Sequence, residues 1–308
     1  MNIGEGQVPG DRAESGLRVS APRWDGHIRP MRHGSVVLFR GWWLALVLVL
    51  LAGRPVCSQL RPLDPVDFSV LGDPSWTVEV GGGIYGGQRA SLAGTSGNLL
   101  EIGTTRIVWG LGRVALELSG TILRVYEDEK VYTDPVGGAR APDGSRRVDA
   151  GDARVSTILR LTGDNASTPI VLRFGTRLPS TDNEVGLGRD QTDFFSTLAV
   201  RPEWGRWAVS AEFGLGINGT RDTGNEQIDP LLFGVTATYD GGSFQPLFEA
   251  TGQHDPRSNR DRRGNENIGE VRLGVRSGTD RWLSVLLIRG WTSTSPDLGL
   301  VVRAGKRF

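Results

Sequence analysis

The chain has 308 residues, with 35 basic and 35 acidic side chains, and 38% of its residues are hydrophobic. The balanced charge argues against nucleic acid as a partner, and the hydrophobic fraction is too low for a helical membrane protein. A single cysteine and three histidines exclude a disulfide framework and most metal or histidine-based chemistry, so we expect no metal and no cofactor.

The N-terminal part of the chain predicts an export signal. Residues 42–52 form a short apolar run that is preceded by basic residues and followed by small ones near Ser58. A membrane-spanning helix needs about 20 apolar residues, so we interpret residues 31–58 as a cleaved signal peptide. Residues 1–30 are polar and lack periodicity, and we expect a disordered extension upstream of the true start at Met31.

Beyond residue 75, apolar and polar residues alternate in segments of about ten residues. Trp207, Phe213 and Ile217 fall on one face of one such segment, and Glu212 falls on the other. Segments of this length and pattern are typical of transmembrane β-barrels, whereas strands of soluble sandwiches are usually shorter. The pattern predicts twelve strands, at about 75–86, 98–110, 113–125, 152–162, 168–178, 193–201, 206–218, 230–239, 243–253, 267–277, 281–290 and 297–308.

The connections between these strands alternate between tight and long. The longer ones are predicted at about 87–97, 126–151, 179–192, 219–229 and 254–266, with a modest one at 291–296. Outer-membrane barrels have short periplasmic turns and long external loops, and an even strand number puts both ends in the periplasm. We therefore predict an all-β fold, a closed antiparallel transmembrane β-barrel of about twelve strands over residues 75–308. A short periplasmic segment, residues 59–74, would precede it.

Aromatic residues gather beside the predicted periplasmic turns and strand starts. Because aromatic rings favour the membrane–water interface, we expect an interfacial girdle there. Its members are Trp76, Trp109, Trp207, Tyr239, Phe244, Trp282 and Phe308.

The alternation also assigns charged side chains to the barrel interior. The predicted lumen-lining arginines are Arg154, Arg160, Arg173, Arg177, Arg201, Arg272, Arg276, Arg289, Arg303 and Arg307. The predicted lumen-lining glutamates are Glu79, Glu101, Glu117, Glu212 and Glu249. In a twelve-stranded barrel these form two opposed arginine walls separated by glutamates. Either salt bridges fill a narrow lumen, or water fills it and the arginines favour anions.

Two segments resemble known outer-membrane barrels. The last strand, Leu298–Phe308, has a terminal aromatic residue after alternating apolar positions, and it resembles the signal that the barrel assembly machinery recognises. Residues 172–182 and 186–194 resemble a strand, loop and strand of porin-like proteins named as transporters of the phenol meta-cleavage pathway. That resemblance implies passive transport of small organic molecules.

The mature chain offers little for catalysis. Its one histidine, His254, lies beside Asp255 in a predicted external loop without a matching serine motif, so we do not expect an enzyme. Our first hypothesis is an outer-membrane pore or passive transporter for small organic solutes, in particular anionic or aromatic ones, in a Gram-negative-type envelope. The alternative is a barrel with an occluded lumen that acts in surface binding, adhesion or envelope structure. Expected partners are outer-membrane lipid, the assembly machinery through Phe308 and a small solute.

Overall fold

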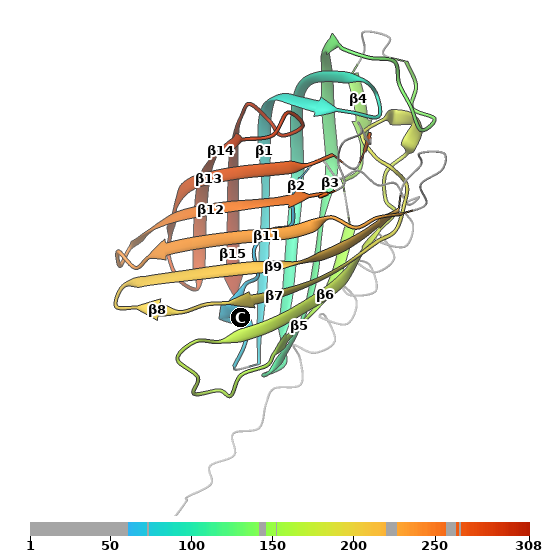
Figure 1. The fold of residues 1–308 in the computed structure, drawn as a ribbon. Coiled ribbons are helices and arrows are strands. Elements are labelled where there is room, and N and C mark those ends of the chain that lie inside the picture. Colours follow the sequence, from blue (N-terminus) through green and yellow to red (C-terminus); the bar gives the residue numbers. More distant parts are fainter. Residues whose placement is uncertain are drawn as a thin grey trace, which may run out of the picture. The chain divides into compact units, whose positions relative to one another are not determined.

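Twelve long antiparallel strands close into a barrel (Figure 1), as seen in a computed structural model of the chain. The structure describes residues 61–72, 74–141, 146–151, 153–219, 227–256, 263–264 and 266–308. The predicted extension at 1–30 and the signal peptide at 31–58 lie outside the described residues. Within the described ranges, no helix is long and apolar enough to cross a membrane.

Short elements accompany the twelve long strands. Two single turns of 3-10 helix are η1 (Phe68–Val70) and η2 (Asn183–Val185). The strands are β1 (Ser75–Ala90), β2 (Thr95–Gly110), β3 (Val114–Val131), β4 (Arg146–Asp149), β5 (Ala153–Arg160), β6 (Ile170–Leu178), β7 (Asp193–Val200), β8 (Glu203–Trp204), β9 (Trp207–Gly219), β10 (Gln227–Ile228), β11 (Leu231–Tyr239), β12 (Phe244–His254), β13 (Ile268–Ser277), β14 (Arg281–Gly290) and β15 (Leu298–Arg307).

The long strands pair in chain order, and β15 returns to pair with β1. The short strands are additions to this wall, since β4 pairs with β3 while β8 and β10 pair with β9. Each of the twelve long strands pairs with a neighbour on both sides, and such closure removes the open edges that lipid cannot satisfy. The predicted closed antiparallel barrel of twelve strands is therefore confirmed, and the placement of its ends in the periplasm stays a prediction.

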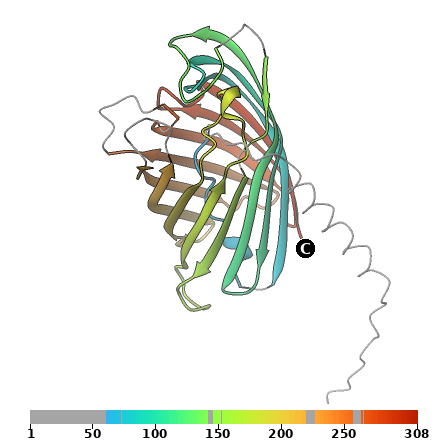
Figure 2. The same ribbon diagram turned by 90° about the vertical axis from the view of Figure 1, so that its right-hand side faces the viewer.

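The first three strands are longer than predicted. The expected long connection at 87–97 is wrong, because β1 and β2 continue until only residues 91–94 separate them, with Gln88 paired to Gly97. Glycines interrupt the alternation here, and Gly87 and Gly94 adopt positive φ angles of 66° and 72° that accommodate an irregular ladder and a tight turn. Backbone pairing thus continues where the side-chain pattern stops. Figure 2 shows β1–β3 rising beyond their neighbours.

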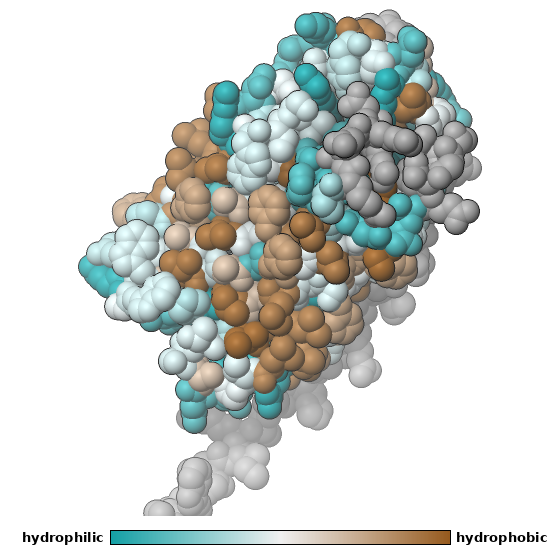
Figure 3. Space-filling model, in the orientation of Figure 1, coloured by the Kyte–Doolittle hydropathy of each residue, from teal (hydrophilic) through white to brown (hydrophobic). Residues whose placement is uncertain are grey.

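The outer surface of the barrel is apolar. Outward positions carry exposed hydrophobic side chains, for example Phe213 and Leu215 on β9 and Leu283 and Leu287 on β14. Figure 3 shows hydrophobic residues gathered across the middle of one face and hydrophilic residues toward both ends. Contiguous apolar surface on this scale is unfavourable in water, and an apolar band with polar ends is typical of a lipid-facing barrel wall.

The interior has three layers. One end of the barrel carries the β2–β3 turn, and we call the buried apolar group there the lower cluster: Val66, Phe68, Val70, Val108, Ala115, Ile158, Val171 and Ala199. The other end carries the β1–β2 turn, and the upper cluster there contains Tyr85, Ala90, Ala93, Leu99, Tyr126, Leu187, Leu247, Leu286, Ile288 and Val301. Between them lies a charged layer of arginines and carboxylates.

Candidate functional site

The chain enters its own barrel before forming the first strand. We call Arg61–Val70 the lumen segment. Its Val66, Phe68 and Val70 are buried in the lower cluster, and its backbone runs through the charged layer. Both views show this stretch inside the wall (Figures 1 and 2). Nothing in the sequence pattern indicated that Arg61–Val70, part of the predicted periplasmic segment 59–74, would reach the lumen.

Proline shapes the lumen segment. Pro62 and Pro65 have no N–H to donate, and proline favours an extended conformation in the residue before it. An extended segment presents its carbonyl oxygens to the wall. Wall arginines donate to three of them: Arg154 to Arg61 O at 3.2 Å, Arg173 to Asp64 O at 3.0 Å and Arg106 to Pro65 O at 3.0 Å.

Two side chains of the lumen segment also form ion pairs with the wall. Oδ1 of Asp64 lies 2.5 Å from Nη1 of Arg272 and 3.3 Å from Nη2 of Arg303. Nη2 of Arg61 lies 2.7 Å from Oε2 of Glu270, and its guanidinium carbon lies 3.9 Å from the centre of the Tyr85 ring. Charge-assisted hydrogen bonds of this kind are stronger than neutral ones, so ion pairs with the wall fix the segment at two of its three charged residues, Arg61 and Asp64.

The wall arginines pair with carboxylates of the wall as well. The pairs within it are Arg106–Glu117 at 2.7 Å, Arg173–Glu212 at 2.6 Å, Arg124–Glu101 at 2.9 Å, Arg272–Glu249 at 3.2 Å, Arg272–Glu270 at 3.3 Å and Arg303–Glu79 at 3.7 Å. Buried charges are tolerated when they are paired in this way. The interior is therefore a network of mixed charge, in which each of these arginines has at least one carboxylate partner.

Most of the predicted lumen-lining residues occupy inward positions. Buried among them are Arg173, Arg177, Arg272, Glu79, Glu101, Glu117, Glu212 and Glu249, while Arg303 is half-buried. Arg154 lines the central cavity, and Arg160, Arg201 and Arg276 lie toward the lower end. Arg160 donates to the carbonyls of Gly163 and Asp164, and the guanidinium carbons of Arg201 and Arg276 lie 6.0 Å and 5.3 Å from the rings of Phe68 and Trp282.

The predicted faces of β14 are wrong. Trp282, Leu286 and Ile288 are buried, whereas Arg289 is exposed beside the outward-facing Leu287. Arg289 therefore does not line the lumen, and Trp282 is not an interfacial aromatic, since its Nε1 donates to Oε2 of Glu79 inside the barrel at 3.2 Å. Both errors have one cause, because a shift of one residue exchanges the two faces of a strand.

The other predicted aromatics remain accessible near the lower end. The rings of Trp76 and Trp109 stack with their centres 4.9 Å apart, and those of Trp207 and Tyr239 lie 5.0 Å apart. Phe244 and Phe308 are exposed. These six rings have the accessibility of an interfacial girdle, and their membrane contact stays a prediction.

Several residues of the charged layer were not predicted. Arg106 falls on the outward face if the alternation at Glu101 is continued along β2, but Gly103 has a φ of 69° and the inward positions change parity across it. An isolated glycine in a strand is the one sequence signal that could have revealed this change. Asp64 and Arg61 lie outside any periodic segment and gave no such signal.

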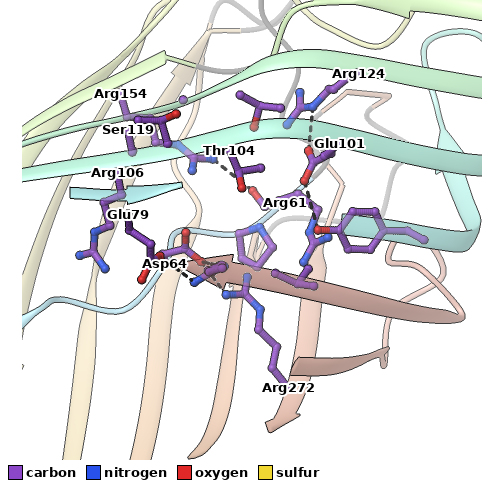
Figure 4. A pocket seen from close by; sticks show the side chains of 17 residues that line it. Arg61, Asp64, Glu79, Glu101, Thr104, Arg106, Ser119, Arg124, Arg154 and Arg272 are labelled. Carbon is purple, nitrogen blue, oxygen red and sulfur yellow. Dashed lines mark hydrogen bonds and ion pairs between the residues drawn. The ribbon is translucent and has the colours of Figure 1, made fainter. Parts of the chain in front are cut away.

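A small cavity of about 70 Å³ lies between the lumen segment and the wall. Figure 4 shows the side chains around it, with Asp64 directed at Arg272. The cavity has room for a few waters, whereas ligand pockets measure about 300–1,000 Å³. Its lining contains six arginines and three carboxylates, namely Arg61, Arg106, Arg124, Arg154, Arg272, Arg303, Asp64, Glu79 and Glu101.

Loops close the upper end of the barrel. Arg189, in the β6–β7 connection, is buried, donates to Gly219 O at 2.6 Å and pairs with Asp193. Arg147 of β4 pairs with Asp128 of β3 at 2.8 Å and donates to Val185 O in the β6–β7 connection at 2.7 Å. These contacts hold the described parts of the loops against the upper end of the barrel.

Comparison with known proteins supports the fold. No family model and no curated protein sequence matches the chain. An outer membrane channel from Pseudomonas putida F1 is similar in structure, with a TM-score of 0.57 and 16% identity over 80% of this chain and 100% of the channel. The translocator domain of the autotransporter NalP from Neisseria meningitidis has a TM-score of 0.44 and 9% identity, over 88% of this chain and 96% of that domain. The toluene transporter TbuX from Ralstonia pickettii has a TM-score of 0.39 and 10% identity, over 83% of this chain and 95% of the transporter.

Proposed function

We propose that this chain is an outer-membrane channel for small solutes that its own lumen segment keeps closed. The apolar outer surface supports a place in lipid, because a closed barrel with such a band buries it in a bilayer. An exposed Phe308 at the end of the last strand fits delivery by the barrel assembly machinery. The resemblance to porin-like proteins of phenol degradation favours passive transport of small organic molecules.

One observation carries the proposal: the centre of the barrel is filled by a peptide segment rather than by the wall. The wall pairs Arg106–Glu117 and Arg173–Glu212 join residues of the barrel alone. Removal of the lumen segment would leave those pairs intact and open the polar interior from the lower end. The charge of a pore lining selects the solutes that pass, and an excess of arginine favours anions. We therefore propose small anionic solutes, including aromatic acids.

The test replaces residues 61–66 with a Gly–Ser sequence of equal length and measures current across planar bilayers. We expect small and infrequent currents from the unaltered protein and larger, persistent currents from the variant. As a control, the same Gly–Ser sequence replaces residues 163–168 in an exposed turn, which should leave the currents unchanged. Heat-modifiable migration in gels would show that each barrel is folded. A folded variant that conducts no more than the unaltered protein would overturn the proposal.

A second candidate function is a barrel with a permanently occluded lumen that acts through its outer loops. The closure of the upper end by buried Arg189 and Arg147 favours it. This candidate predicts no current from any of the three proteins. It also predicts that binding to a cell surface or to a matrix polymer would depend on the upper loops and survive the Gly–Ser replacement at 61–66.

A further inference from the structure

We propose that the Asp64 carboxylate occupies a binding site for a small carboxylate solute, so that the chain carries an internal substitute for its own ligand. The site consists of Arg272 and Arg303, with Arg106 and Arg173 beside them. This inference rests on the proposed function, because a solute would reach the site only through the lumen.

The geometry around Asp64 is that of a bound anion. Arg272 of β13 and Arg303 of β15 come from different strands, and both approach the same oxygen, Oδ1. Arg272 is 1% exposed, while the side chain of Asp64 remains 32% exposed. The buried arginine is thus fixed by the wall, and the carboxylate that satisfies it is accessible to a competitor.

The neighbouring arginines bind the backbone of Asp64 and of Pro65, which follows it. Arg173 donates to Asp64 O and Arg106 donates to Pro65 O, both at 3.0 Å. When the lumen segment leaves, these donors and the Asp64 contacts are vacated together. Each of these arginines keeps a wall carboxylate, but the N–H groups that donate to the segment lose their acceptors. Buried donors are costly to leave unsatisfied, so an incoming anion would be favoured over an empty site.

The balance of charge selects an anion. Arg303 has Asp64 at 3.3 Å and Glu79 at 3.7 Å, so loss of Asp64 removes its nearer carboxylate. Arg272 keeps Glu249 and Glu270, at 3.2 and 3.3 Å, and Glu270 also pairs with Arg61 while the segment is in place. Once the lumen segment has left with Arg61 and Asp64, the remaining cavity lining holds five arginines and two carboxylates.

The cavity also indicates the rest of the ligand. Tyr85 and Val301 of the wall line it together with the arginines, so an apolar surface lies close to the anion position. Its volume of about 70 Å³ would grow only by the space that Asp64 and its neighbours vacate. A monocarboxylate with a short aliphatic or aromatic tail meets both conditions.

Competition at this site couples binding to opening. A solute carboxylate and Asp64 cannot both contact Arg272 and Arg303, so each bound solute favours the displaced lumen segment. By linkage, anything that displaces the segment must equally favour solute binding. The same contact therefore closes the channel at rest and responds to its ligand.

The test uses isothermal titration calorimetry with the full-length mature protein in detergent and benzoate as the probe. Benzamide, which is nearly equal in shape but neutral, is the ligand control. Asp64→Asn removes the internal carboxylate, and we expect it to bind benzoate at least about tenfold more tightly, because the competent state is no longer self-occupied. Benzamide should show no gain, and Arg303→Gln in the Asp64→Asn background should abolish the gain for benzoate.

The matched protein control is Asp67→Asn. Asp67 lies in the same segment, but its carboxylate accepts hydrogen bonds from the backbone and hydroxyl of Ser69. This variant loses the same charge and should bind benzoate like the unaltered protein. An equal gain in Asp67→Asn, an equal gain for benzamide, or no gain in Asp64→Asn would overturn the inference.

A measurement on the unaltered protein keeps the inference testable if Asp64→Asn does not fold. Benzoate should accelerate cleavage before Asp64 by the protease Asp-N, and benzamide should not. Identical cleavage with both probes would also overturn the inference. Calorimetry does not depend on conduction, so the two proposals can fail independently. Tighter benzoate binding by Asp64→Asn, without conduction by the Gly–Ser variant, would contradict the channel but not the anion site. Conduction by the Gly–Ser variant, without tighter benzoate binding, would contradict the anion site but not the channel.

Discussion

The two ends of the barrel are both closed by apolar clusters, but by different means. At the lower end, Val66, Phe68 and Val70 of the lumen segment fill the space between wall residues. At the upper end, wall residues such as Leu286 and Ile288 pack against one another and against loops. The apolar residues that the lumen segment contributes at the lower end lie on one short segment before the first strand, whereas those at the upper end lie mostly on the strands of the wall.

This difference indicates where a passage can open with least cost. Moving the lumen segment breaks contacts to three carbonyls and a few side chains but no strand pairing. Opening the upper cluster would require rearranging inward side chains of β1, β2, β3, β12, β14 and β15. Opening at the lower end is therefore compatible with an intact wall, and the following comparisons test that distinction in order of expected effect.

The largest contrast is expected when a carboxylate is placed in each cluster. Val70 and Leu286 are 0% and 1% exposed, and an unpaired buried charge costs several kcal/mol. In Val70→Asp the lumen segment can leave the barrel, so the fold should persist while protease sensitivity and bilayer current increase. In Leu286→Asp the side chain cannot leave, so the barrel itself should become unstable. Equal loss of stability in both variants would remove the distinction between the two ends.

A smaller contrast is expected within the charged layer. Arg173 is 2% exposed and contacts Glu212 and the lumen segment, so Arg173→Ala should destabilise the barrel by about 3–5 kcal/mol, the cost of an uncompensated buried partner. Arg201 is partly exposed and lies 3.5 Å from Glu203, and Arg201→Ala should cost about 0–1 kcal/mol. Urea unfolding in lipid vesicles measures both. Similar losses would mean that the charged layer is open to water.

The inward face of β14 can be tested through its tryptophan. Trp282→Phe removes the hydrogen bond to Glu79 and should cost about 1.5–3 kcal/mol, as for a donor to a charged group. The control is Trp204→Phe, because Trp204 is 61% exposed, and that change should remain within about 0.5 kcal/mol. Fluorescence should also show Trp282 shielded from aqueous quenchers. Ready quenching of Trp282 by an aqueous quencher would place it elsewhere.

The smallest effect is expected in the outer loops. Glu184 forms a side-chain hydrogen bond with Arg140 that raises the pKa of the guanidinium, which therefore stays charged throughout the pH range of the cell envelope. Both side chains are exposed, and water screens such pairs. Arg140→Gln should leave the unfolding transition unchanged. A measurable shift would show that the loops contribute to the upper closure more than their exposure indicates.

The sequence alone determined the wall of this protein. The alternation of apolar and polar residues predicts all twelve long strands, and most of the predicted strand boundaries lie within a few residues of the observed ones. The reason is that every strand must place apolar side chains on one face and polar ones on the other. It failed at the β1–β2 connection, where glycines remove the signal while the backbone continues to pair. It also assigned β14 to the wrong faces, because periodicity fixes a repeat but not which of its two phases points inward.

Only the tertiary structure decided what the lumen contains. No periodic signal marks Asp64, and its partners Arg272 and Arg303 lie more than 200 residues further along the chain. The glutamates and arginines could be assigned to the interior by parity, but their pairing depends on the register between strands and on the segment that lies among them. The wall follows from a local rule that each strand obeys separately, whereas the site follows from distances that exist only after the barrel has closed.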